Sequence, residues 1–207
     1  MGSEMCIRDS GKYWWNVDGI QNKRAADDVG FINSLLEMLV NLYNIDSKRI
    51  YVAGMSNGGF MSFALACNLS EKITAIASVT GSMTPKTIEE CSVNNAMPVL
   101  IIHGTADKVI PYEGRPKGSL PILKVVEFWS DFNECNPKFK KRKLPDIDKT
   151  DGSVVEKYTY KNKKTKVKVV HYKVINGRHD WFGERSNRDI KTAQVIWDFF
   201  KDYKIQE

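Results

Sequence analysis

Residues 49–60 read RIYVAGMSNGGF, and this stretch decides the fold. Its first part, Arg49 to Ala53, is short, apolar and rich in β-branched side chains, which predicts a buried parallel strand. Gly54 to Gly58 then matches G-x-S-x-G, the pattern of a sharp turn that joins a strand to a helix and exposes its serine. We therefore expect Ser56 at the carboxyl end of a strand, with glycine needed at Gly54 and Gly58 because neighbouring chain passes close.

Helical and strand patterns alternate on both sides of this turn. Apolar residues have helical spacing in residues 25–43, 58–69, 122–132 and 192–203, and strand-like runs occupy 73–79, 97–102, 154–160 and 167–175. The last two runs are expected to form a hairpin whose second strand enters the sheet, and residues 136–152 are expected to be a surface loop. This order predicts an α/β fold, a mostly parallel sheet with helices on both faces.

A serine hydroxyl at neutral pH needs a base to take its proton and an acid to orient that base. Among the three histidines, His179 follows the last strand in a loop and is the expected base. His103 ends a strand and is expected to be packed, and His171 lies within a strand and is expected to be structural or exposed. Asp107 lies just beyond the strand 97–102 and is the expected acid. Its competitors lie in a helix, in the surface loop or beside the base: Asp131, Asp146, Asp148 and Asp180.

The backbone N–H of Asn57 opens the helix after the serine and is expected to bind the developing oxyanion. A second donor is expected from an earlier strand-to-helix loop, and no such loop precedes residue 49 in this sequence. The first ten residues, MGSEMCIRDS, match a translated sequencing-library adapter when read back into codons, and we interpret them as an artefact. Residues 11–207 are then a single domain, the C-terminal part of a hydrolase whose opening strands and any signal peptide are missing.

Composition limits the classes of partner. Hydrophobic residues make up 42% and the net charge is +6, and no apolar run is long enough to span a membrane. The excess lysines in 138–143 and 161–168 are interpreted as solvated surface, because a nucleic-acid groove needs such clusters on one face beside aromatic residues. Cysteine spacing predicts no metal site. Cys67 is expected in the core, and whether Cys91 and Cys135 pair in an oxidising compartment is left open.

With these residues in place, the chain resembles the polyhydroxybutyrate depolymerase and feruloyl esterase family of secreted bacterial and fungal α/β-hydrolases. The matching stretches are residues 27–32 (DDVGFI), 49–60, 98–112 (PVLIIHGTADKVIPY) and 196–200 (IWDFF). The resemblance covers nearly all of residues 13–203. It implies Ser56, Asp107 and His179 as a catalytic triad, no metal or organic cofactor, an ester substrate and a secreted or periplasmic location.

One departure from the family lies around the base. The family usually has GGHTWP where this chain has GRHDWF at 177–182, so Asp180 adds a charge that is expected to raise the pKa of His179 or alter substrate preference. The resemblance places Trp181 at the substrate site, with loop packing as its alternative role. It places Trp15, between Trp14 and Asn16, near the same cleft.

The expected reaction is ester hydrolysis through an acyl-enzyme on Ser56. The expected substrate is a hydroxyalkanoate polyester, or a feruloyl or acetyl ester on plant polysaccharide. One alternative is a serine peptidase of the prolyl-oligopeptidase type, which shares the triad order. The other is a silent fragment, because a strand 49–53 without its usual neighbour would tend to aggregate.

Overall fold

The computed structural model describes residues 14–17, 26–183 and 186–205. The segment interpreted as an adapter, with Cys6, lies outside the described residues. The elements follow one another as α1 (Asp28–Leu42), β1 (Tyr51–Met55), α2 (Asn57–Asn68), β2 (Ala75–Val79), α3 (Pro85–Glu89), β3 (Val99–Gly104), α4 (Ile122–Phe132), β4 (Lys140–Lys143), β5 (Val154–Lys161), β6 (Lys168–Ile175) and α5 (Thr192–Phe200).

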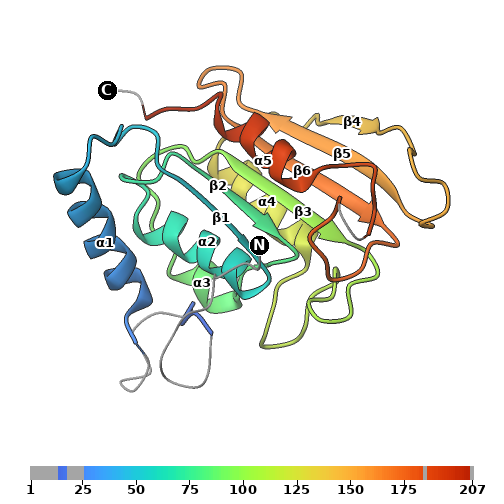
Figure 1. Ribbon diagram of the computed structural model, residues 1–207, viewed down its shortest axis with the longest axis horizontal. Helices are drawn as coiled ribbons and strands as arrows, with labels where there is room; N and C mark the ends of the chain where they lie inside the picture. The colour runs from blue at the N-terminus through green and yellow to red at the C-terminus, as the bar shows by residue number, and fades with distance from the viewer. Residues whose placement is uncertain (1–13, 18–25, 184–185, 206–207) are drawn as a thin grey trace.

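The strands form one twisted sheet in the order β1-β2-β3-β6-β5-β4 (Figure 1). Strands β1, β2, β3 and β6 are parallel, and β5 and β4 continue the sheet in antiparallel pairing. The hairpin of β5 and β6 is confirmed, and β6 enters the sheet beside β3 as predicted. All four parallel strands therefore end at one edge, where the turns that follow β1, β3 and β6 meet.

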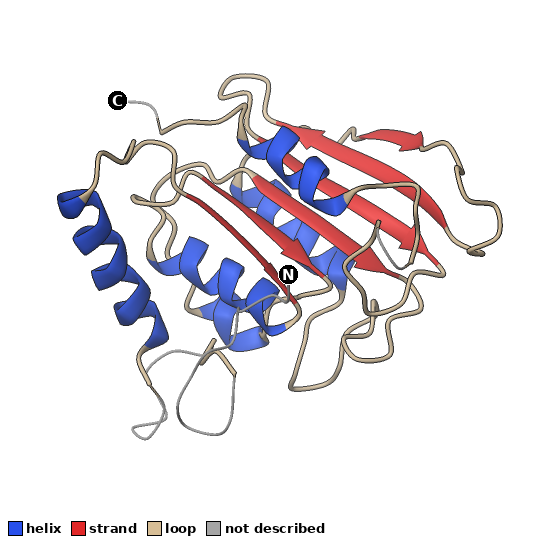
Figure 2. Ribbon diagram, viewed as in Figure 1, coloured by secondary structure: helices blue, strands red, loops and turns tan. Residues whose placement is uncertain are grey.

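Helices cover both faces of the sheet (Figure 2). On one face α2 and α4 pack together through Phe63 and Trp129, whose ring centroids lie 6.2 Å apart, over the side chains of Ile76 and Ile101. On the other face α5 places Phe200 against the alanines, valines and leucine of the central strands. The predicted mostly parallel sheet between two helical layers is therefore confirmed.

The end of the sheet at β1 is less completely packed. Among the described residues, β1 pairs with β2 alone, and Ala53 on it is exposed. Helix α1 forms over the expected residues, but Phe31 is 57% exposed and Leu42 is 66% exposed. The apolar stripe that predicted an amphipathic helix is thus only partly covered.

The structure corrects one expectation about a loop and identifies the partner of Cys67. Residues 140–143, expected to be loop, form strand β4, whose four side chains are all exposed and basic. Such a sequence lacks the apolar alternation by which strands are recognised, and charge is a common device on an edge strand. Cys67 lies in the core as predicted, and it forms a disulfide with Cys91 across a Cα–Cα distance of 4.7 Å. Cys135 is therefore free and does not pair with Cys91.

Candidate active site

Ser56 lies between β1 and α2 in a backbone conformation that few residues adopt, with φ 54° and ψ −119°. Its N–H donates to the carbonyl of Val79, at the end of the neighbouring strand, over 2.9 Å. Glycine is required at Gly54 because a Cβ there would collide with the backbone of Gly58. At Gly58 itself a Cβ would meet nothing within 4 Å, so the expectation that this position also needs glycine to avoid a neighbour was wrong.

Two other glycines, which the sequence did not single out, hold this turn against β2. A Cβ on Gly59 would lie 2.9 Å from Gly81 Cα, and a Cβ on Gly81 would lie 2.7 Å from Gly59 Cα. Either would also crowd Ser78 Oγ, at 2.5 and 2.6 Å. The start of α2 and the turn after β2 therefore touch backbone to backbone. The doubled glycine at 58–59 was the available signal for this contact.

Asp107 and His179, far apart in the sequence, are joined by a hydrogen bond of 2.7 Å between Oδ2 and Nδ1. The second carboxylate oxygen of Asp107 accepts the N–H groups of Val109 and Ile110, each over 2.8 Å. The Asp107 side chain is fully buried and that of His179 is 18% exposed. Burial opposes ionisation of Asp107, but the hydrogen bonds from His179 and Ile110 outweigh it and hold the pKa of this carboxyl below its usual value.

The two loops that carry this pair are locked together by backbone contacts. Gly104, at the end of β3, leaves no room for a side chain because the carbonyl of Gly177 lies against it. The N–H of Ala106 donates to Gly177 O over 2.9 Å, and Asn176 N–H donates to Thr105 Oγ1 over 2.9 Å. The geometry of the acid and the imidazole is thus set by rigid backbone rather than by the side chains alone.

The other two histidines are buried and hydrogen-bonded to other residues. His103 is fully buried and its Nε2 lies 2.8 Å from the carbonyl of Ile110, so it donates there and supports the turn that holds Asp107. Burial lowers its pKa. His171 is bonded to the Tyr112 hydroxyl over 2.8 Å, and burial lowers its pKa to about 3. The prediction that His103 is packed is confirmed, and of the two alternatives for His171 the structural one holds.

Ser56 stands at the same edge of the sheet as Asp107 and His179, because β1, β3 and β6 are parallel and each is followed by one of these residues. Within the described chain, the Ser56 hydroxyl has no hydrogen bond to His179. Bonds between nucleophile and base are commonly long in enzymes without substrate. The contact between serine and imidazole therefore stays a prediction, whereas the hydrogen bond between imidazole and carboxylate is present in the structure.

A polar bridge of two hydrogen bonds links Trp15, expected near the site, to Asn57, the residue after Ser56. The N–H of Trp15 donates to Asn57 Oδ1 over 2.6 Å, and Asn57 Nδ2 donates back to the Trp15 carbonyl over 3.2 Å. Asn16 N–H in turn donates to Asp28 Oδ2 over 2.7 Å. This bridge fixes residues 14–17 next to the residue that follows Ser56. The backbone N–H of Asn57 is in the first turn of α2, where helices leave donors unpaired.

Asp180 and Trp181 follow the imidazole directly. The Asp180 carboxylate accepts the N–H of Trp181 over 2.7 Å. Trp181 is partly exposed and packs against the apolar cluster under α5. It thus fulfils the packing role, and its place at the substrate site stays a prediction. Of the competing carboxylates, Asp148 binds Arg188 over 3.1 Å in the surface loop.

Comparison with known proteins finds similarity to esterases. A family model described as phospholipase/carboxylesterase matches residues 7–149. Feruloyl esterase B of Piromyces equi is 28% identical over 201 residues, which are 92% of this chain and 34% of that protein. The bifunctional acetylxylan esterase/xylanase XynS20E of Neocallimastix patriciarum is 24% identical, over 95% of this chain and 26% of that protein. The chain therefore spans about a third or less of the length of these relatives.

Solved structures share the fold. An acetyl xylan esterase from Aspergillus awamori superposes with a TM-score of 0.59 at 14% identity, covering 84% of this chain and 67% of that one. A thermostable esterase superposes with a TM-score of 0.54 at 16% identity, covering 86% of this chain and 37% of that one. The fold is that of the α/β-hydrolases, as predicted. No helix in the described ranges has the length and apolar character needed to cross a membrane.

Proposed function

Because the chain belongs to the phospholipase/carboxylesterase family, we propose that it is a serine carboxylester hydrolase with Ser56 as nucleophile, His179 as base and Asp107 as the acid that orients the base. The observation that carries this proposal is the strained serine turn at the sheet edge where a buried carboxylate binds an imidazole over 2.7 Å. A buried, ionised Asp107 fixes the ring of His179 so that its Nδ1 donates and its Nε2 is left to accept a proton.

In the proposed reaction, His179 Nε2 takes the proton of Ser56 while the serine oxygen attacks the ester carbonyl carbon. The N–H of Asn57 donates to the oxygen that becomes negative in the tetrahedral intermediate. The alcohol leaves with the proton from His179, which leaves an acyl group on Ser56. Water then attacks the acyl-enzyme with His179 again as base, and the free acid departs.

For the substrate, we propose a feruloyl or acetyl ester carried by plant polysaccharide. The support is that two similar proteins are a feruloyl esterase and a bifunctional acetylxylan esterase/xylanase. A hydroxyalkanoate polyester is the competing substrate, and an amide is the substrate expected if the chain is a peptidase instead. Action outside the cytoplasm is supported by the disulfide between Cys67 and Cys91, since such bonds persist in oxidising compartments.

The decisive test removes the nucleophile. Ser56→Ala is expected to lower kcat for p-nitrophenyl acetate and methyl ferulate by a factor of about 10³ or more, because a triad without its serine retains only binding and oxyanion stabilisation. The matched control is Ser34→Ala, which removes an exposed serine on α1 and should leave kcat unchanged. Rates on a 3-hydroxybutyrate oligomer and on a p-nitroanilide, measured alongside, separate the three substrate classes.

Two results would contradict the proposal. Turnover that survives in Ser56→Ala would mean that another group attacks the ester. A folded chain with cooperative thermal unfolding that hydrolyses none of these compounds would instead favour the silent-fragment alternative.

A further inference from the structure

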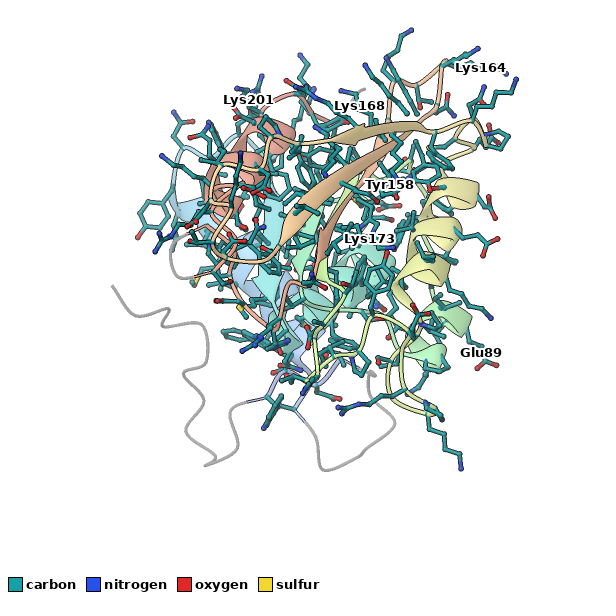
Figure 3. All side chains as sticks on the ribbon, turned by 90° about the vertical axis from the view of Figure 1, so that its right-hand side faces the viewer. Glu89, Tyr158, Lys164, Lys168, Lys173 and Lys201 are labelled. Atoms are coloured by element: carbon teal, nitrogen blue, oxygen red, sulfur yellow. A yellow bond between two sulfur atoms is a disulfide. The ribbon has the colours of Figure 1, made fainter. Side chains whose placement is uncertain are left out.

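A cavity of about 470 Å³ lies between α5 and the part of the sheet formed by β4, β5 and β6. Its charged lining consists of Lys140, Arg142, Lys157, Lys168, Asp198 and Asp202. Figure 3 views the molecule from the side of β4 and β5, with Lys168 and Lys201, which follows α5, both labelled near the top. We call this site the basic groove. None of the proposed triad residues lines it.

Strand register brings the cations together. Arg142 of β4 lies directly opposite Lys157 of β5, and Lys157 lies opposite Tyr172 of β6, so the three side chains share one face. The Nζ atom of Lys157 lies 5.0 Å from the centre of the Tyr172 ring, which holds that charge over the floor of the groove. Two like charges directly opposite each other on a sheet are destabilising, and a bound anion would relieve that repulsion.

The protein neutralises the positive charge of the groove only in part. Lys168 has Asp202 at 4.0 Å, and Asp198 is bonded to Lys201 and to Gln194. Within the described part of the chain, no ion pair involves Lys140, Arg142 or Lys157. On the opposite face of the same strands the pattern differs, because Lys141 pairs with Glu156 over 2.8 Å. Three cations on the side that forms the cavity therefore have no ionic partner among the described residues: Lys140, Arg142 and Lys157.

We propose that the basic groove binds the carboxylates of an acidic polysaccharide, a sugar chain that carries uronic acids; this inference rests on the proposed action on polysaccharide esters. Arg142 can bind a carboxylate through two parallel hydrogen bonds. The acidic side chains in the same cavity select against a continuous phosphate backbone, which Asp198 and Asp202 would repel. Those carboxylates can instead accept hydrogen bonds from sugar hydroxyls. A sugar chain whose carboxylates are separated by hydroxyls fits this lining better than nucleic acid does.

The groove is placed to help the proposed reaction. Strand β6 runs from the groove toward His179, and its groove residues from Lys168 to Tyr172 lie seven to three residues before its end at Ile175, about 23 to 10 Å along the strand. A polymer held in the groove raises the local concentration of its ester groups at the carboxyl edge of the sheet. The groove therefore acts on the affinity for polymeric substrate and not on the chemical step.

The test measures binding of oligogalacturonate to the purified chain by titration calorimetry. Wild type is expected to bind saturably, and Arg142→Glu and Lys157→Glu are each expected to weaken binding about tenfold or more, since each removes one ion pair and adds repulsion. The matched control is Lys124→Glu, which makes the same charge change at an exposed site on α4 and should bind as wild type does. Binding should weaken with added salt.

Three results overturn the inference: wild type does not bind oligogalacturonate, Lys124→Glu weakens binding as much as the groove variants do, or an oligothymidylate of equal charge binds as tightly. Hydrolysis of p-nitrophenyl acetate, measured on every variant, separates this inference from the proposed function. Groove variants that fold should hydrolyse it at the wild-type rate. A wild type that hydrolyses the small ester but does not bind oligogalacturonate counts against the groove alone, and an inactive wild type counts against the proposed function.

Discussion

The positions of Ser56, Asp107 and His179 could be predicted because each follows a strand that has a clear local pattern in the sequence. A serine between glycines at the end of an apolar run, an aspartate after the next-but-one strand and a histidine after the last one were each predicted from position alone. What could not be predicted was the contact of Gly104 with Gly177, which joins loops 73 residues apart and leaves no local pattern. That contact holds Asp107 against His179.

Asp107 offers a sharp prediction. Asp107→Asn is expected to lower kcat on p-nitrophenyl acetate by a factor of about 10⁴ at pH 7, because the amide no longer selects the productive tautomer of the ring. The matched control is Asp131→Asn on α4, an exposed carboxylate that was the competing candidate. Retention of more than a tenth of kcat in Asp107→Asn would show that this residue does not orient the base.

The same residue predicts a pH profile. Its pKa is lowered below 3.8 in the folded chain, so the carboxylate stays ionised as pH falls from 7 toward 5, and its contribution to stability is lost only when the pH falls through the folded pKa. The acid limb of kcat/KM should therefore belong to a group other than Asp107. Measuring kcat/KM between about pH 3 and 9 tests this. An acid limb with its midpoint below pH 4 would contradict the expectation.

Among the elements, those with a clear apolar period were predicted to within a few residues, and those without one were missed. Helix α4 was predicted at its observed bounds. The basic strand β4 was missed because it has no apolar face from which a strand could be predicted. The pairing of Cys67 with Cys91 depends on how α2 approaches the end of α3. Spacing along the chain does not encode that approach, so the choice of partner could not be read from the sequence.

This disulfide closes a loop with a sequence separation of 24 and is expected to stabilise the fold by about 3 kcal/mol through the entropy of the unfolded chain. Cys67→Ala should lower the free energy of unfolding by a similar amount, measured by urea denaturation monitored by circular dichroism. Cys135→Ala removes the free thiol and serves as the control. If dithiothreitol leaves the urea midpoint of wild type unchanged, the bond is absent in solution.

Packing is uneven across the whole molecule, with a well-buried core around β2, β3 and β6 and an exposed side at β1. The core is closed on both faces by buried aromatic residues, among them Trp129 and Phe182. At the open side, β1 pairs only with β2 among the described strands, and the exposed stripe of α1 includes Phe31 and Met38. This openness was predicted from the interpretation of residues 1–10 as an adapter, which leaves the strand 49–53 without its usual neighbour.

An unpaired strand edge beside exposed apolar side chains is a template for association. The 207-residue chain by itself is therefore expected to self-associate as its concentration rises, measured by sedimentation velocity between micromolar and ~100 μM concentrations. Ala53→Lys places a charge on the exposed middle of β1 and should reduce that association, whereas Ala193→Lys adds the same charge on exposed α5 and should not. A wild-type chain that stays monomeric throughout this range would show that α1 and residues 14–17 cover the edge of β1 well enough in solution. The reduction must be specific to Ala53→Lys, because general charge repulsion would lower association equally in both variants.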